Sequence, residues 1–122
     1  PCVFTRGLDF MDLPVRHGEG KVFTLDKNLL RRLEASRCVP CRYADPGSGE
    51  PTQAFPHNPN GALNAIAGLC DPTGRVFGLM PHPEAYLYPE NHPHWDMQKL
   101  RGTLPEHGLG LLFFRNAVDH LR

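Results

Sequence analysis

The segment with the clearest chemical potential is Met80-Pro81-His82-Pro83-Glu84, which directly follows an apolar run typical of a strand. Prolines on both sides hold His82 in an extended conformation, and residues two apart in such a segment project to the same side. The Glu84 carboxylate can therefore bind one imidazole nitrogen and stabilise the imidazolium that forms when the other nitrogen takes a proton. The segment predicts a general base with its orienting carboxylate, although by spacing alone His-x-Glu is more typical of a structural or surface histidine.

A base of this kind needs a nucleophile, and the sequence places no cysteine where one is expected. Nucleophiles are commonly presented on a sharp turn between a strand and a helix, with glycine two residues before and two after. Cys70 has Gly68 before it but Pro72 after it, and it precedes a hairpin turn. Cys2 lies too near the start of the chain to follow a strand. We therefore expect no catalytic nucleophile in this chain.

The remaining cysteines, Cys38 and Cys41, form a Cys-x-x-Cys pair, a spacing that occurs in redox and zinc sites. The pair follows the end of a predicted helix rather than a strand, and no second pair accompanies it. Reduced structural thiols are the favoured interpretation, and a thioredoxin-like redox role is the alternative.

An alternative use of the histidines is a metal site or a partner-binding surface. Imidazole and carboxylate groups suit zinc or iron, and the two histidines of His92-Pro93-His94 can project to one side. The spacing is not diagnostic, and proline-rich histidine loops are usually surface features. We therefore expect no metal, and keep a non-catalytic module as the second hypothesis. Its candidate ligands are His82, Glu84, Glu90, His92 and His94.

A second histidine and glutamate, His17 and Glu19, have the same spacing after a β-like run and could line a substrate site. A simple turn between two strands is the favoured interpretation of this stretch. The glycines around Glu19 do not belong to a Walker-type or Gly-x-Gly-x-x-Gly pattern that opens a helix, so the sequence does not support nucleotide binding.

The elements that position these residues are short. Apolar runs predict strands over 2–5, 13–16 and 21–24, and a helix over 27–35 with Asp26 as its N-cap. Residues 39–43 can form a strand, but Pro40 restricts it to a sheet edge because proline cannot donate to a ladder. Residues 45–61 are rich in Gly, Pro, Ser and Asn and predict a long surface loop.

The second half of the chain contains the clearest supersecondary signal. Residues 65–69 and 75–80 flank Asp71-Pro72-Thr73-Gly74, a turn that specifies a β-hairpin. Residues 81–107 predict irregular structure, and a final helix follows over 109–121. Its apolar stripe, which we expect to dock on a sheet, consists of Leu111, Phe114, Val118 and Leu121.

Composition limits the broad class of protein. The chain has 122 residues, and 40% hydrophobic content is enough for one modest core. Thirteen basic residues balance thirteen acidic ones, which argues against a dedicated binder of nucleic acid or acidic membranes. No apolar run approaches the roughly 20 residues that span a bilayer, and no secretory signal is recognisable. We expect a soluble cytoplasmic protein with no membrane partner.

Four segments, taken in this order, resemble the glutaminase domain of phosphoribosylformylglycinamidine synthase, a class I glutamine amidotransferase of purine biosynthesis. They are residues 13–20, 58–61, 66–71 and 74–84. Residues 112–118 are also similar to the C-terminal helix of that family. The similarity covers essentially the whole chain. The His-Gly-Glu-Gly, Asn-Pro-Asn-Gly and Met-Pro-His-Pro-Glu motifs in one order make it specific.

The resemblance implies a Cys-His-Glu triad that hydrolyses glutamine through a γ-glutamyl thioester and passes ammonia to an ATP-dependent synthetase. His82 corresponds to the general base and acid, and Glu84 to its orienter. The family's nucleophile lies in a Gly-x-Cys-x-Gly turn, which this chain lacks. We therefore expect residues 1–122 to be the C-terminal half of a flavodoxin-like amidotransferase domain that is inactive alone.

Further expectations follow from the same resemblance. This half should be α/β, with an antiparallel strand portion and a C-terminal helix. It should need no cofactor, because ATP and Mg belong to the synthetase domain or subunit that is its partner. His17 and Glu19 should lie near the glutamine pocket or the synthetase interface. Such a half should also expose apolar surface that absent strands would cover, so we expect self-association.

Overall fold

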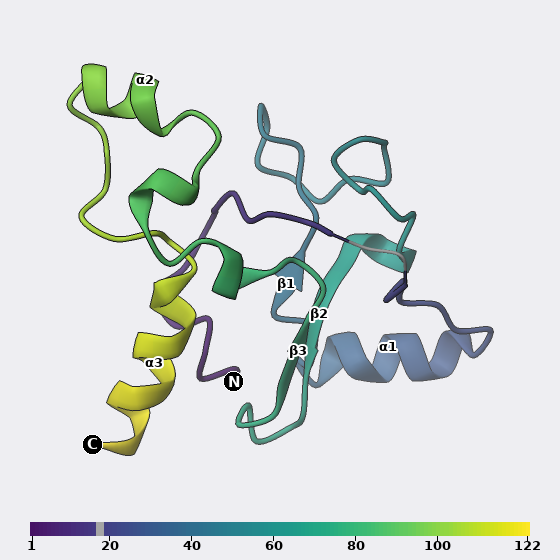
Figure 1. Cartoon of the computed structure of the whole chain (residues 1–122). Helices are drawn as coiled ribbons and strands as arrows, with labels where there is room; N and C mark the ends of the chain where they lie inside the picture. Colours follow the sequence, from purple (N-terminus) through teal and green to yellow (C-terminus); the bar gives the residue numbers. More distant parts are fainter. Residues whose placement is uncertain (17–18) are drawn as a thin grey trace.

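A three-stranded antiparallel sheet lies at the centre of the computed structural model, which describes residues 1–16 and 19–122 (Figure 1). The strands lie in the order β1 (Cys41–Arg42), β2 (Ile66–Cys70) and β3 (Phe77–Leu79). Strand β1 starts directly after Pro40 and lies at an edge, as predicted, but is shorter than expected. With the helices described below, this confirms the expected α/β class, its antiparallel strands and its C-terminal helix.

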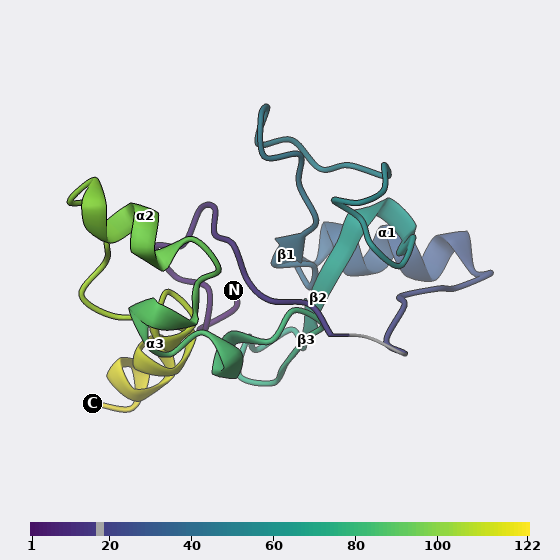
Figure 2. The same ribbon diagram turned by 45° about the horizontal axis from the view of Figure 1, so that its top comes forward.

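Helices α1 (Lys27–Ala35) and α3 (Leu111–Leu121) lie on opposite sides of the sheet in both ribbon views (Figures 1 and 2). Asp26 caps α1 as predicted, because its carboxylate accepts hydrogen bonds from two backbone N–H groups of the first turn. Glu34 of α1 then pairs with Arg42 of β1 at 2.8 Å. This ion pair ties α1 to the edge of the sheet.

The hairpin of β2 and β3 is confirmed. Gly68 lies opposite Leu79, and Cys70 lies opposite Phe77. The connecting turn closes with a hydrogen bond from the backbone N–H of Gly74 to the carbonyl of Asp71, 3.0 Å long. Gly74 has a φ of +72°, a conformation that glycine adopts without steric cost. The hairpin delivers the end of β3 to the candidate site.

The Asp71 carboxylate organises this turn, and we expect its removal to abolish part of the acid sensitivity of the fold. It accepts hydrogen bonds from the Thr73 hydroxyl and from three backbone N–H groups, which lower its pKa to about 2. Because this pKa lies below the usual value of about 4, the carboxylate stabilises the hairpin above pH 4, and that stabilisation is lost as the pH falls toward 2. Thermal unfolding followed by circular dichroism should show a smaller acid-induced fall in Tm for Asp71→Asn than for the wild type. Asp9→Asn, at an exposed position, is the control and should behave like the wild type.

Helix α3 meets the sheet with a different face from the predicted stripe. Phe113 is buried, and its ring stacks 6.1 Å from that of Phe77 on β3. One turn later, the side-chain amide of Asn116 donates to the carbonyls of Phe4 and Arg6, at 2.9 Å each. These contacts fix the rotation of the helix about its axis. The predicted docking stripe is therefore wrong, and its members exposed to solvent are Phe114, Val118 and Leu121.

The three strands predicted near the N-terminus are wrong for the residues that the structure describes. Residues 2–5 form no strand: a turn covers 4–7, and the Val3 amide just before it donates a hydrogen bond to the Gly74 carbonyl of the hairpin. Residues 13–16 and 21–24 lie outside any strand. Apolar, β-branched composition alone was insufficient, because a strand also needs a neighbour with which to pair.

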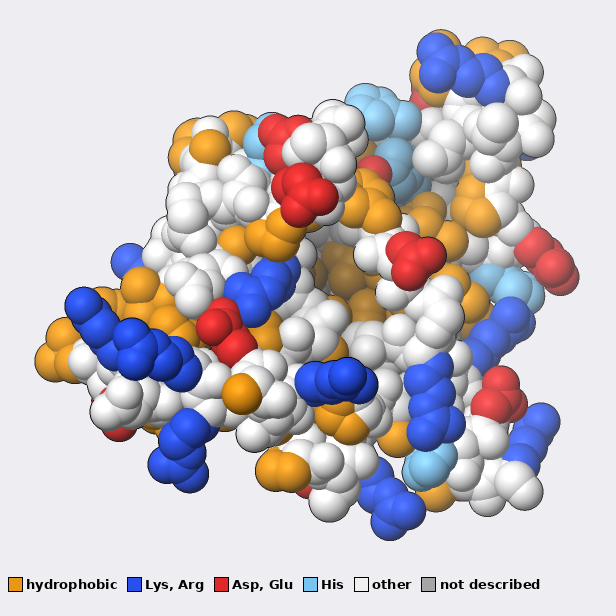
Figure 3. Space-filling view, turned by 180° about the vertical axis from the view of Figure 1, so that it is seen from behind, with side chains coloured by type: hydrophobic (Ala, Val, Ile, Leu, Met, Phe, Trp, Pro, Cys, Tyr) orange, Lys and Arg blue, Asp and Glu red, His pale blue; other side chains and the backbone are white. Residues whose placement is uncertain are grey.

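The predicted irregular region 81–107 contains one helix that the sequence did not reveal, α2 (Trp95–Leu100). Two short 3-10 helices precede it, Pro83–Ala85 and Pro89–Asn91, and each begins with proline, which suits a first helical position. No helix among the described residues has the length and apolar character that crossing a membrane requires. Hydrophobic side chains nevertheless reach the surface between charged ones (Figure 3). Self-association of the chain remains a prediction.

Candidate active site

His82 and Glu84 lie side by side just after β3. Nδ1 of His82 is 2.7 Å from Oε1 of Glu84, which confirms the predicted approach of the carboxylate to the imidazole. Because a carboxylate only accepts hydrogen bonds, this contact assigns the proton to Nδ1 and leaves Nε2 as the nitrogen that can take a proton. The prolines on either side of His82 restrict the backbone around this pair.

Three backbone contacts hold this short segment. The amide of Met80 donates to Ala67 at 2.9 Å and continues the hydrogen bonding of the sheet beyond β3. The amide of His82 donates to the carbonyl of Pro14 at 2.8 Å. The amide of Ala85 donates to the His82 carbonyl at 3.2 Å and closes the first 3-10 turn. The histidine is thus held by the sheet on one side and by Pro14, in the extended stretch 9–16, on the other.

The two ring nitrogens of His82 have different surroundings. Nδ1 binds Glu84, whereas Nε2 is buried and has no hydrogen-bond partner within residues 1–16 and 19–122. The hydrogen bond from His82 is the main cause that holds the pKa of Glu84 below its usual value, so this carboxylate is ionised at neutral pH. A carboxylate on one nitrogen and an unpaired second nitrogen suit general-base chemistry toward a group placed next to Nε2.

The cysteines do not provide such a group. All four are free thiols, and Cys2, Cys38 and Cys70 are buried. Burial is the main cause that raises the pKa of Cys41 to about 12 and that of Cys70 to about 11. Since the thiolate is the reactive form, Cys41 and Cys70 stay protonated and unreactive at neutral pH. The absence of a catalytic nucleophile from this chain stays a prediction.

The metal-binding alternative finds no support in the geometry. Within the described part of the chain, no three His, Cys, Asp or Glu residues are grouped so that they could hold a metal ion. His92 instead faces Asp12, with Nε2 3.9 Å from Oδ2, and its Nδ1 accepts a hydrogen bond from the His94 amide at 3.1 Å. The contact between Asp12 and His92 was not predicted, because nothing in the spacing of residues so far apart indicates it.

The other predicted site residues lie elsewhere. His17 falls outside the residues that the structure describes. Glu19 is exposed to solvent. Asn58 of the Asn-Pro-Asn-Gly motif is buried, where its side chain exchanges two hydrogen bonds with the backbone of Ala62, at 3.0 and 3.1 Å. The motif therefore closes the long loop onto the start of β2 in this structure.

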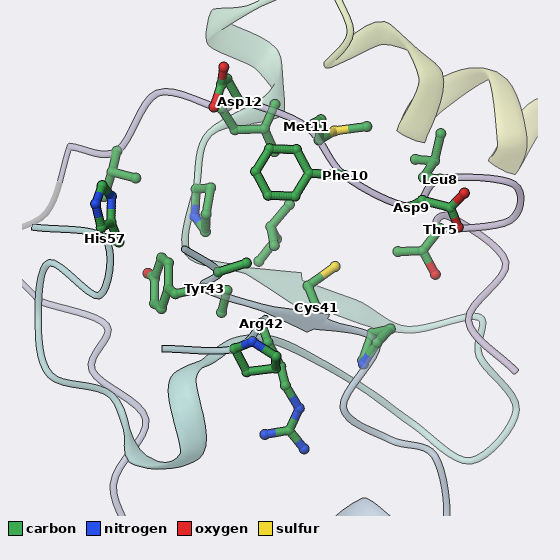
Figure 4. Close-up of a pocket in the computed structure, with 18 of the residues that line it drawn as sticks. Thr5, Leu8, Asp9, Phe10, Met11, Asp12, Cys41, Arg42, Tyr43 and His57 are labelled. Carbon is green, nitrogen blue, oxygen red and sulfur yellow. The ribbon is translucent and has the colours of Figure 1, made fainter. Parts of the chain in front are cut away.

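A cavity of about 600 Å³ lies on the sheet face opposite α1 (Figure 4). The side chain of Phe10 covers the cavity. Cys41, in the edge strand β1, and Tyr43, the residue after that strand, project into the cavity. Tyr43 is buried, and its hydroxyl has no hydrogen-bond partner among the described residues. Pro81 also lines the cavity, so the cavity adjoins the His82 segment without including the imidazole.

Comparisons with known proteins show the family to which the chain is similar. The profile of the CobB/CobQ-like glutamine amidotransferase domain matches residues 1–121. Phosphoribosylformylglycinamidine synthase subunit PurQ of Methanococcus maripaludis strain C5 is 39% identical over 125 residues, which cover 98% of this chain and 46% of that protein. The subunit PurQ of Dehalococcoides mccartyi is 40% identical over 121 residues, covering 99% of this chain and 44% of that protein.

A longer relative shows the same similarity. The probable phosphoribosylformylglycinamidine synthase, chloroplastic/mitochondrial, of Arabidopsis thaliana is 35% identical over 127 residues, which cover 99% of this chain and 9% of that protein. The chain therefore spans less than half the length of these curated relatives.

Proposed function

Because the chain belongs to the CobB/CobQ-like glutamine amidotransferase domain family, we propose that it supplies the general base of a glutaminase. The observation that carries this proposal is the pair of His82 and Glu84, with Nδ1 on the carboxylate at 2.7 Å and Nε2 buried without a partner among the described residues. The names of the relatives support phosphoribosylformylglycinamidine synthase, and hence purine biosynthesis, as the setting.

In the proposed reaction, a thiol attacks the side-chain amide carbon of glutamine while Nε2 of His82 takes the thiol proton. The imidazolium then gives this proton to the amide nitrogen, which leaves as ammonia. A γ-glutamyl thioester remains on the thiol. Water, activated by the same nitrogen, hydrolyses the thioester to glutamate and restores the thiol. Glu84 stabilises each imidazolium and keeps the ring in the tautomer that the cycle requires.

The catalytic thiol belongs, in this proposal, to sequence that the relatives have and this chain does not cover. Support comes from the burial of Cys2, Cys38 and Cys70 and from the 46% coverage of the Methanococcus subunit. The ammonia passes to a synthetase domain or subunit, which uses ATP and Mg. Thiol and imidazole chemistry needs no cofactor in the glutaminase part itself.

We expect a diazoketone analogue of glutamine to leave all four cysteines of this chain unmodified at neutral pH. The reagent alkylates a thiolate that is activated in a glutamine site, and burial keeps Cys41 and Cys70 protonated. Intact-mass spectrometry after incubation provides the measurement. Iodoacetamide applied to the unfolded chain is the control and should add four labels. A stoichiometric adduct on any cysteine of the folded chain would falsify the proposal that the catalytic thiol lies outside this chain.

The positive test uses a complemented enzyme, defined as this chain joined to the portion of the Dehalococcoides mccartyi subunit that it does not match. We expect this protein to release glutamate from glutamine, whereas the chain alone should not. A complemented enzyme that folds, accepts the diazoketone on the supplied thiol and still fails to hydrolyse glutamine would contradict the role of His82.

A further inference from the structure

An extended segment, residues 9–16, crosses the end of the sheet next to the candidate site (Figure 1). Among the described residues, it makes one hydrogen bond and one longer contact between a carboxylate and an imidazole. The hydrogen bond runs from the His82 amide to the carbonyl of Pro14, at 2.8 Å. The longer contact is formed by Asp12, whose Oδ2 lies 3.9 Å from Nε2 of His92. The two polar anchors of the segment are thus two residues apart, and one of them is bound to the backbone of His82.

The imidazole of His92 is held so that it can serve as an anchor. Its side chain is 13% exposed, and its ring centroid lies 5.7 Å from that of the buried Tyr86. Nδ1 accepts a hydrogen bond from the His94 amide, so Nδ1 is the unprotonated nitrogen and Nε2 carries the hydrogen that faces Asp12. The orientation of the His92 ring is set by the loop that carries it and not by Asp12. The ring can therefore hold residues 9–16 in place.

We propose that Asp12 and His92 are positioning residues for His82. Their contact holds residues 9–16 against the loop that carries His92, and this keeps the carbonyl of Pro14 on the His82 amide. The amide then fixes the backbone from which the imidazole reaches Glu84. Neither residue touches the reacting atoms. The inference rests on the proposed function, because it concerns the placement of the general base.

Amide hydrogen exchange measured by NMR on the whole chain tests this proposal directly. Asp12→Ala removes the carboxylate, and we expect exchange at the His82 amide to become on the order of fivefold faster, as the loss of one partly exposed polar contact does. His92→Asn keeps an acceptor near the position of Nδ1 but lacks Nε2, so it should behave like Asp12→Ala. His92→Gln keeps an N–H near the position of Nε2 and should retain wild-type exchange.

Two controls separate a local anchor from general destabilisation. The Met80 amide, which bonds to Ala67 in the same protein, should exchange at the wild-type rate in every variant. Glu106→Ala removes the carboxylate that lies 3.6 Å from His107, another acid and histidine pair, and should leave His82 unchanged. Faster exchange at Met80 and His82 together, or unchanged exchange at His82 in Asp12→Ala, overturns the proposal.

A spectroscopic readout follows the effect to the imidazole. Long-range nitrogen-15 spectra report which ring nitrogen of His82 is protonated. We expect the share of the Nδ1–H form to fall in Asp12→Ala and His92→Asn and to be restored in His92→Gln. Equal spectra in all variants would contradict the proposal. Neither the exchange measurement nor the nitrogen-15 spectra involve glutamine. A failure of the proposed glutaminase would instead be seen as a complemented enzyme that is inactive although its pair of His82 and Glu84 is intact.

Discussion

Glu84→Gln lowers kcat for glutamine hydrolysis by the complemented enzyme by about 10²- to 10⁴-fold, which is the expected result of removing the charge from the partner of a general base. The amide is neutral, so it no longer stabilises the imidazolium of His82. Its NH₂ end also favours the ring tautomer with an unprotonated Nδ1, which leaves the proton on the nitrogen that must accept one. The 2.7 Å contact makes this dependence strong.

Glutamate release under saturating glutamine measures this effect. Glu106→Gln is the matched control, because Glu106 is also an exposed glutamate beside a histidine but lies outside the candidate site. It should retain wild-type kcat. The change is aimed at chemistry rather than folding, since the Glu84 side chain is 60% exposed and its replacement leaves no cavity. Wild-type kcat in Glu84→Gln would show that the carboxylate has no catalytic part.

The features predicted correctly from the sequence depend on neighbours within a few residues. The approach of Glu84 to His82 follows from two prolines and a spacing of two, and the hairpin follows from the turn at Asp71. The cap at Asp26 is equally local. In each case the partners lie within a few residues of each other, so the residue types and their spacing suffice to predict the contact.

The features that the sequence did not reveal depend on packing between distant segments. The rotation of α3 is fixed by Phe113 on Phe77 and by Asn116 on the N-terminal turn, so the apolar stripe on another face was misleading. The anchors of residues 9–16 join positions remote from one another in the sequence. Short β-like runs near the N-terminus have no strand beside them among the described residues, and their composition could not show this.

Gly110, the residue before α3, shows how the fold constrains the site, and its replacement should disturb the packing of α3 against the segment that contains Glu84. A Cβ added at Gly110 would overlap the carbonyl oxygen of Pro83 and lie 2.8 Å from that of Tyr86. Both neighbours are backbone atoms, which cannot rotate away as a flexible side chain can. The helix would have to withdraw from the 3-10 turn that contains Glu84.

We therefore expect Gly110→Ala to lower the free energy of unfolding by about 1–3 kcal/mol, as overpacking at a close backbone contact does. Urea denaturation measures this change. Gly78→Ala is the matched control, because a Cβ at that position in β3 meets no heavy atom within 4 Å. In the complemented enzyme, Gly110→Ala should also reduce kcat, since Pro83 connects His82 to Glu84 and cannot move without altering their contact. If Gly110→Ala and Gly78→Ala were equally stable and equally active, the start of α3 would not stabilise the 3-10 turn that contains Glu84.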